Sequence, residues 1–201
     1  MIKGGLEIHI YDFDMTLFRS PEPPNWWSKR VLGQWHADEV SLGIPFVDIT
    51  PPSSYWVSEV LAHAKESIRD PNTWAIVLTG RPDYGHLRYR VAELLGQKGL
   101  RFDQVILKRP IEAKTSHFKR LVTDRLLQKY PLVKKIQVWE DNTENIDALR
   151  DLSKKKGLAF KGHLVKTTPA PLLLDLSKEE YLISLKDQIP SKEWNYIQKR
   201  L

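Results

Sequence analysis

Cysteine is absent from the 201 residues of this chain, and its absence excludes several kinds of chemistry. A chain without cysteine forms no disulfide bonds, holds no zinc through thiolates and uses no cysteine nucleophile. This composition suits a reducing compartment, so we expect an intracellular protein, either cytoplasmic or nuclear.

Long apolar runs are absent as well. No stretch approaches the roughly eighteen apolar residues that a membrane-spanning helix needs. The opening residues, MIKGGLEIHI, also lack the apolar region and the small-residue cleavage site of a secretory leader. We therefore expect neither a membrane partner nor a leader peptide.

The chain has enough apolar residues for a core and carries an excess of positive charge. Hydrophobic residues make up 41% of it, which suits a single domain spanning residues 1–201. The net charge of +6 favours polyanionic partners such as nucleic acid or phosphorylated substrates. A charge that only keeps the protein soluble explains the same number equally well. The composition does not indicate an oligomeric state.

Strand-like and helix-like patterns alternate along most of the chain. Short apolar runs predict four strands, at residues 6–13, 74–79, 104–108 and 135–140, and a weaker fifth at 162–167. Amphipathic patterns predict helices over residues 53–70, 83–99, 115–131 and 142–157. This alternation predicts an α/β fold with a mostly parallel central sheet flanked by helices.

Two segments fall outside this alternation. Residues 19–52 hold six prolines and three tryptophans without a clear period, which predicts a short irregular insertion after the first strand. Residues 169–201 predict a C-terminal appendage of two short helices packed on the main domain. Ser177 and Glu180 form the capping box that opens the first of these helices.

The carboxyl ends of three predicted strands carry acidic or hydroxyl side chains. Asp12 and Asp14 follow the first strand, Thr79 ends the second, and Glu140 and Asp141 end the fourth. Ligands of parallel α/β sheets bind beyond these ends, so the side chains are expected at one rim. Carboxylates at such short distances repel each other unless a cation lies among them. Magnesium suits such a site because it binds a few carboxylates and keeps places for water and phosphate.

The same residues resemble the motifs of a known superfamily. The segment DFDMT at residues 12–16 resembles the first motif of the haloacid dehalogenase (HAD) superfamily. Thr79 resembles its second motif, Lys119 its third, and Glu140 with Asp141 its fourth. All four occur in the superfamily's order. The resemblance implies a HAD-like Rossmannoid fold.

A narrower resemblance is also visible. The stretches LTGRPD, TSHFKR and VWEDN are similar to the Swiss Army Knife RNA repair-like HAD family, whose lysine stands in the Thr-x-x-Phe-Lys context of residues 115–119. That family follows its Glu-Asp pair with Arg and then His, whereas this chain has Asn142 and Asn145 nearby. Whether Glu140 or Asn145 assists a metal is therefore left open.

The superfamily resemblance implies chemical roles for the acidic residues. Asp12 is expected to attack phosphorus as the nucleophile, and Asp14 to act first as general acid and then as general base. Magnesium is expected between Asp12, Asp14 and Asp141, with Glu140 as a further metal-site residue. Because dehalogenation does not need the acid at Asp14, the pattern favours phosphoryl transfer.

Other residues are expected to bind the phosphoryl group. Thr79 and the amides near Phe13 and Gly80 are expected to hydrogen-bond its oxygens, and Lys119 to neutralise them. Arg81 is either a substrate contact or the partner of a loop carboxylate.

The lysine role has competitors in Lys114 and Lys108. Lys119 is preferred because it lies on a helical turn beside an apolar residue, Phe118, that fixes it in place.

The insertion raises a prediction about substrate size. HAD proteins commonly carry a cap between their first two motifs, and residues 19–52 are too few for a cap domain. An abbreviated flap leaves the cleft open to a large substrate. Lys29 and Arg30 stand among three tryptophans, which serve either packing or base stacking, and we expect these two cations to contact a nucleic-acid strand.

The sequence thus predicts a magnesium-dependent phosphomonoesterase that acts through an aspartyl-phosphate on a phosphorylated RNA or DNA end. Two other functions stay open. One is a phosphatase of a small metabolite or nucleotide, and the other is a non-catalytic nucleic-acid-binding module on a HAD fold.

Overall fold

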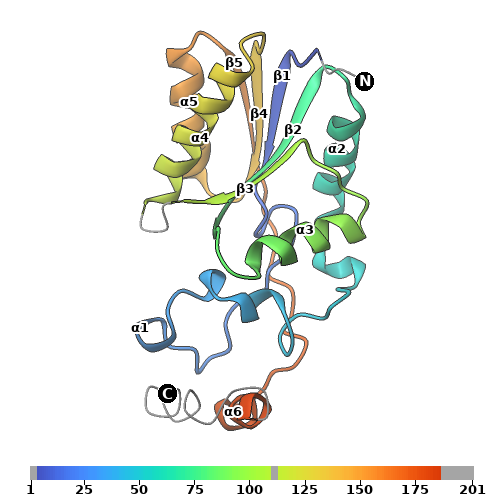
Figure 1. Cartoon of the computed structure of the whole chain (residues 1–201), viewed down its shortest axis with the longest axis vertical. Coiled ribbons are helices and arrows are strands. Elements are labelled where there is room, and N and C mark those ends of the chain that lie inside the picture. Colours follow the sequence, from blue (N-terminus) through green and yellow to red (C-terminus); the bar gives the residue numbers. More distant parts are fainter. Residues whose placement is uncertain (1–3, 110–112, 187–201) are drawn as a thin grey trace.

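Five parallel strands form the centre of the computed structural model, which describes residues 4–109 and 113–186 (Figure 1). They follow the spatial order β3-β2-β1-β4-β5. Their bounds are β1 Glu7–Tyr11, β2 Thr73–Pro82, β3 Gln104–Lys108, β4 Lys135–Glu140 and β5 Ala159–Leu164. The order reverses between β2 and β4 on either side of β1, and such a switch point is where α/β folds bind ligands.

Helices cover both faces of the sheet, as Figure 1 shows. One face packs on α2 (Ser58–Arg69) and α3 (Leu87–Gln97), and the other on α4 (Thr115–Lys129) and α5 (Thr143–Lys155). Ile8 and Ile10 of β1 pack towards α4 and α5, whereas Tyr11 packs towards α2. Both faces of β1 are therefore covered, which explains its apolar sequence. The α/β prediction, with a Rossmann-like parallel sheet, is confirmed.

Some element boundaries differ from the sequence prediction. The helix predicted from residue 53 begins at Ser58, because residues Ser53–Tyr55 form a separate 3₁₀ turn. The helix predicted from Asp83 begins at Leu87, because Gly85 has a positive φ of 52°, which a right-handed helix does not contain. The fifth strand begins at Ala159, three residues earlier than predicted, because it pairs with β4 directly after the turn that ends α5.

The insertion at residues 19–52 has little regular structure. Its helical parts are α1 (Lys29–Leu32) and two 3₁₀ turns, Trp35–Ala37 and Glu39–Leu42. It packs against the C-terminal helix α6 (Lys178–Lys186). Together they form an apolar cluster whose buried members are Trp35, Phe46 and Tyr181.

The first C-terminal helix, α6, begins with the capping interaction that the sequence predicted. Ser177 Oγ accepts from the Glu180 backbone N–H at 3.2 Å, and the Glu180 side chain accepts from the Ser177 N–H at 2.8 Å. This reciprocal pair is the expected capping box. The second predicted C-terminal helix lies outside the described residues. Within residues 4–109 and 113–186, no helix is both long enough and apolar enough to cross a membrane.

Tyr181 offers a test of the contact between the insertion and α6. Its ring is 7% exposed and packs 5.4 Å from the Phe46 ring, centroid to centroid. Tyr181→Ala should lower the free energy of unfolding by about 3 kcal/mol, because a buried aromatic side chain is removed. Urea denaturation and limited proteolysis of the insertion measure this. Tyr89→Ala, at a residue 73% exposed on α3, is the matched control; equal effects of the two variants would contradict the packing role.

Candidate active site

A buried lysine and two carboxylates meet where β1, β4 and α4 come together. Lys119 Nζ on α4 lies 2.6 Å from Asp12 Oδ1 and 2.5 Å from Glu140 Oε2. Asp12 follows β1 directly, and its backbone N–H donates to the Trp139 carbonyl of β4 at 3.0 Å. This bond extends the pairing of β1 and β4 by one residue, which brings Asp12 beside Glu140. The arrangement places one ammonium between two anions from neighbouring strands.

The start of α4 is held close to β2 by a residue without a side chain. A Cβ atom on Gly80 would lie 3.0 Å from Thr115 Cγ2, so a larger residue would crowd the Thr115 side chain at the start of α4. From Thr115 the helix runs through buried Phe118 and brings Lys119 to Asp12.

The two competing lysines have other partners. Lys114 Nζ pairs with Glu144 Oε1 at 2.7 Å, and Lys108 Nζ donates to the Ala113 carbonyl at 3.0 Å. Of the three candidates, Lys119 is therefore the one that contacts Asp12.

Burial and charge crowding govern the titration of this cluster. Burial raises the pKa of Asp12, and repulsion from Glu140 raises that pKa further, while Lys119 opposes both effects. Burial likewise raises the pKa of Glu140, against hydrogen bonds from Lys119 and Asn145. Although burial disfavours its charge, attraction to Asp12 and Glu140 holds the pKa of Lys119 above its ordinary value. Lys119 thus remains a cation, and the carboxylates around it compete for its charge.

Three carboxylates of this site could hold a metal ion. Ligand oxygens of Asp12, Glu140 and Asp141 lie within 4.8 Å of one another. Burial raises the pKa of Asp141, and the Asp12 charge raises it further. Three carboxylates face one ammonium, so a further cation relieves their repulsion, and oxygen donors are the ligands that magnesium prefers. The residues therefore fit Mg²⁺. Asn145 donates from Nδ2 to Glu140 Oε1 at 3.0 Å and so orients the Glu140 carboxylate.

Asp14 has a different set of partners from Asp12. Arg81 Nη2 lies 2.7 Å from Asp14 Oδ1, and Arg81 Nε lies 3.0 Å from both carboxylate oxygens. The Ser20 hydroxyl also donates to Asp14, and His36 Nδ1 lies 3.9 Å from it. Although burial alone would raise the pKa of Asp14, the charge of Arg81 and hydrogen bonds from Arg81 and Ser20 hold it below its usual range. Asp14 is thus an ionised carboxylate in this arrangement.

Arg81 also joins the site to the insertion. Its side chain is 1% exposed, and Nη1 donates to the His36 carbonyl at 3.0 Å and to Ser41 Oγ at 2.7 Å. The guanidinium lies over the Phe13 ring at 6.0 Å. Of the two roles left open by the sequence, pairing with a carboxylate is the one that this geometry displays, and the carboxylate is Asp14.

Two further residues that the sequence predicted for phosphate binding, Thr79 and Phe13, are buried. Thr79 is buried, and its Oγ1 accepts from the Arg81 backbone N–H at 3.1 Å. The Phe13 side chain is in the core, stacked on Phe18. Only its backbone amide is therefore available for the phosphate binding that the sequence predicted.

Lys29 and Arg30 are exposed on α1, at the end of the molecule that carries α6 (Figure 1). In the described part of the chain, no hydrogen bond or ion pair connects these two residues to the Asp12 cluster. The tryptophans of the insertion pack with Phe46 and Tyr181.

Three residues of the insertion were missed by the sequence reasoning: Ser20, His36 and Ser41. They belong to no motif, because their placement depends on how an irregular segment folds over Asp14 and Arg81. The nearest signal was the run FRSP, in which Ser20 lies four residues after the end of the first motif.

Comparison with known proteins identifies the family of this chain. Residues 15–185 match HAD domain family 1 in Swiss Army Knife RNA repair proteins. The match covers most of the chain, so the protein has a HAD domain, and it belongs to that family.

Two relatives illustrate the likeness. An uncharacterized protein of Saccharomyces cerevisiae, YMR265C, is 28% identical over 166 residues, which make up 72% of this chain and 36% of the yeast protein. A chain in the Pnkp1/Rnl/Hen1 complex has a similar fold, with a TM-score of 0.52 and 14% identity over 82% of this chain and 48% of that one. This chain thus spans less than half the length of either relative.

Arg81 permits a double-variant test of the pair with Asp14. Arg81→Met should lower the free energy of unfolding by about 3 kcal/mol, because it leaves the Asp14 carboxylate, 17% exposed, without its cation. Adding Asp14→Asn should recover part of that loss, since no charge then remains unpaired. Urea denaturation of the unmodified protein, both single variants and the double variant measures the coupling. Strictly additive losses would show that the pair does not stabilise the fold.

Proposed function

We propose that this protein is a magnesium-dependent phosphomonoesterase that acts on phosphorylated nucleic-acid ends, RNA ends above all. The observation that carries the proposal is the buried Lys119 between Asp12 and Glu140, with Asp141 beside them. A nucleophilic carboxylate, a fixed cation and a place for a metal are the parts that phosphoryl transfer through an aspartyl-phosphate needs. Membership of a family from RNA repair proteins supports the choice of substrate class.

In the first half of the proposed reaction, an Asp12 carboxylate oxygen attacks the phosphorus of the monoester. The bond from phosphorus to the ester oxygen breaks, and Asp14 supplies the proton that converts the leaving oxygen to a hydroxyl. Lys119 neutralises charge on Asp12 and the phosphoryl group. Thr79 Oγ1 already accepts from the Arg81 amide, which leaves its O–H free to donate to a phosphoryl oxygen.

In the second half, water attacks the aspartyl-phosphate and Asp14 accepts the water proton. Inorganic phosphate leaves, and the Asp12 carboxylate is restored. The pair with Arg81 keeps Asp14 ionised, which is the form that this second half uses. Proton donation in the first half needs a protonated Asp14, so substrate binding must loosen the pair with Arg81.

Asp12, Asp141 and the Asp14 backbone carbonyl would hold Mg²⁺, with Glu140 as a further oxygen donor. When bound, the ion screens the repulsion between the phosphate and the Asp12 carboxylate. Because Glu140 is itself held by Lys119 and Asn145, it positions Lys119 in addition to any contact with the ion.

A phosphatase of a nucleotide or small metabolite is the second candidate. Ser20 donates a hydrogen bond to Asp14, His36 lies 3.9 Å from it, and the Asp14 side chain is 17% exposed, which favours a small substrate. The third possibility, a binding module without activity, fits the site poorly, because buried carboxylates repel a phosphate unless they serve its chemistry.

Asp12→Asn tests the proposed nucleophile. An amide forms no aspartyl-phosphate, so phosphate release should fall by a factor of about 10⁴ or more while the fold is retained. Release is measured with magnesium on a 3′-phosphorylated oligonucleotide, a 5′-phosphorylated one, a mononucleotide and para-nitrophenyl phosphate. Asp147→Asn, at an exposed residue of α5, is the matched control. Near-normal release by the Asp12 variant would exclude the covalent mechanism, and release from the mononucleotide alone would favour the second candidate.

Asp141→Asn tests the proposed metal site. Loss of one of the clustered carboxylates should raise the magnesium concentration needed for half-maximal activity by about tenfold or more. A magnesium titration of phosphate release, with Asp147→Asn again as control, measures the shift. Full activity of the unmodified protein in excess chelator would contradict metal dependence itself.

A further inference from the structure

A cavity of about 550 Å³ opens beside the candidate active site, between the insertion and the start of α4. Residues from four segments of the chain line it, among them Gln34, His36, Gly80, Lys108, Lys114 and Thr115. Two of these residues lie next to residues of the candidate active site. His36 lies against Asp14 and Arg81, and Gly80 stands between Thr79 and Arg81 in β2. A ligand in this cavity would therefore adjoin the phosphoryl site.

The charge of this cavity suits an anion. Lys108 and Lys114 line it, and none of its described lining residues is an aspartate or glutamate. An ammonium has three N–H donors. Lys108 uses one on the Ala113 carbonyl and Lys114 one on Glu144, so both keep donors for a ligand. Lys114 is 70% exposed, so its head group can move towards a bound strand.

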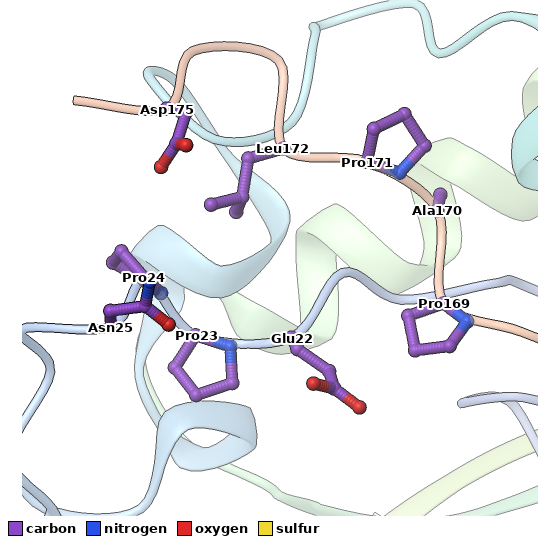
Figure 2. A pocket seen from close by; sticks show the side chains of 9 residues that line it. All are labelled: Glu22, Pro23, Pro24, Asn25, Pro169, Ala170, Pro171, Leu172 and Asp175. Carbon is purple, nitrogen blue, oxygen red and sulfur yellow. The ribbon is translucent and has the colours of Figure 1, made fainter.

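Another cavity, of about 460 Å³, has the opposite character. It lies between the insertion and the C-terminal segment, and prolines from both segments line it (Figure 2). Its charged residues are Glu22 and Asp175, which repel a phosphate group. Of these two cavities, the one beside α4 is therefore the one that admits a polyanion.

We propose that the cavity beside α4 receives the terminal nucleotide of the phosphorylated strand, and that Lys108 and Lys114 bind the phosphodiester that follows it. The inference rests on the proposed function, because it places the leaving part of the same substrate. It also places the strand in this cavity and not along the route over Lys29 and Arg30 that the sequence suggested. The tryptophans of that route pack within the protein, whereas the cavity is lined by His36, whose Nδ1 lies 3.9 Å from Asp14 Oδ1.

The test compares three double variants on short phosphorylated oligonucleotides and on para-nitrophenyl phosphate, with magnesium present. For Lys108→Ala/Lys114→Ala, the KM for the oligonucleotide should rise about tenfold relative to the KM for para-nitrophenyl phosphate. The slope of log KM against log salt should fall by about 0.7, since each neutralised phosphate of a single strand contributes about 0.7. Lys65→Ala/Arg69→Ala on α2 removes the same charge from exposed positions and controls for net charge.

The outcomes separate the inference from the proposed function. An oligonucleotide KM that rises only for Lys29→Ala/Arg30→Ala would overturn the inference and place the strand over α1. Equal effects of the Lys108/Lys114 and Lys65/Arg69 variants would also overturn it. If the unmodified protein hydrolyses neither substrate, the proposed function fails. Fluorescence anisotropy with a labelled, phosphorylated oligonucleotide then still decides the inference, which requires binding to weaken about tenfold in Lys108→Ala/Lys114→Ala alone.

Discussion

Two carboxylates and one ammonium share the buried space where β1, β4 and α4 meet, and the rest of the site depends on keeping them there. Asp12 and Glu140 can both be buried because Lys119 lies between them at hydrogen-bonding distance. A buried ion set of this kind costs desolvation free energy, which is recovered only with close geometry and further hydrogen bonds. The parallel pairing of β1 with β4 and the close approach of α4 to Gly80 supply that geometry. The excess negative charge that remains is what makes the site suited to a metal ion and, with it, a phosphate.

Arg81 extends this electrostatic arrangement to the insertion. A single buried guanidinium binds the Asp14 carboxylate, the His36 carbonyl and the Ser41 hydroxyl. The insertion is therefore attached to residues of the candidate active site, in addition to its apolar contacts with α6. A shift of the insertion would change the partners of Asp14, so the position of the insertion and the charge state of this carboxylate are physically connected.

Much of the fold and part of the site could be predicted from local sequence. The apolar run of β1 followed by alternating aspartates, and the helical position of Lys119 beside Phe118, are patterns that backbone geometry converts directly into position. The first residues of α2 and β5, Ser58 and Ala159, were harder to predict, because a 3₁₀ turn decides the one and the register with β4 the other. Two neighbours of Asp14, Ser20 and His36, could not be predicted, since an irregular segment supplies them.

The sequence by itself determined the order of the elements, the motif residues at the strand ends and the family to which the chain belongs. These follow from hydrophobic periodicity and from side chains whose spacing is local. Only the tertiary structure decided that Lys119 lies between Asp12 and Glu140, that Arg81 holds Asp14 and the insertion together, and that Lys108 and Lys114 line one cavity. Each of those features depends on distances between segments far apart in the chain, and such distances are set by packing rather than by local pattern.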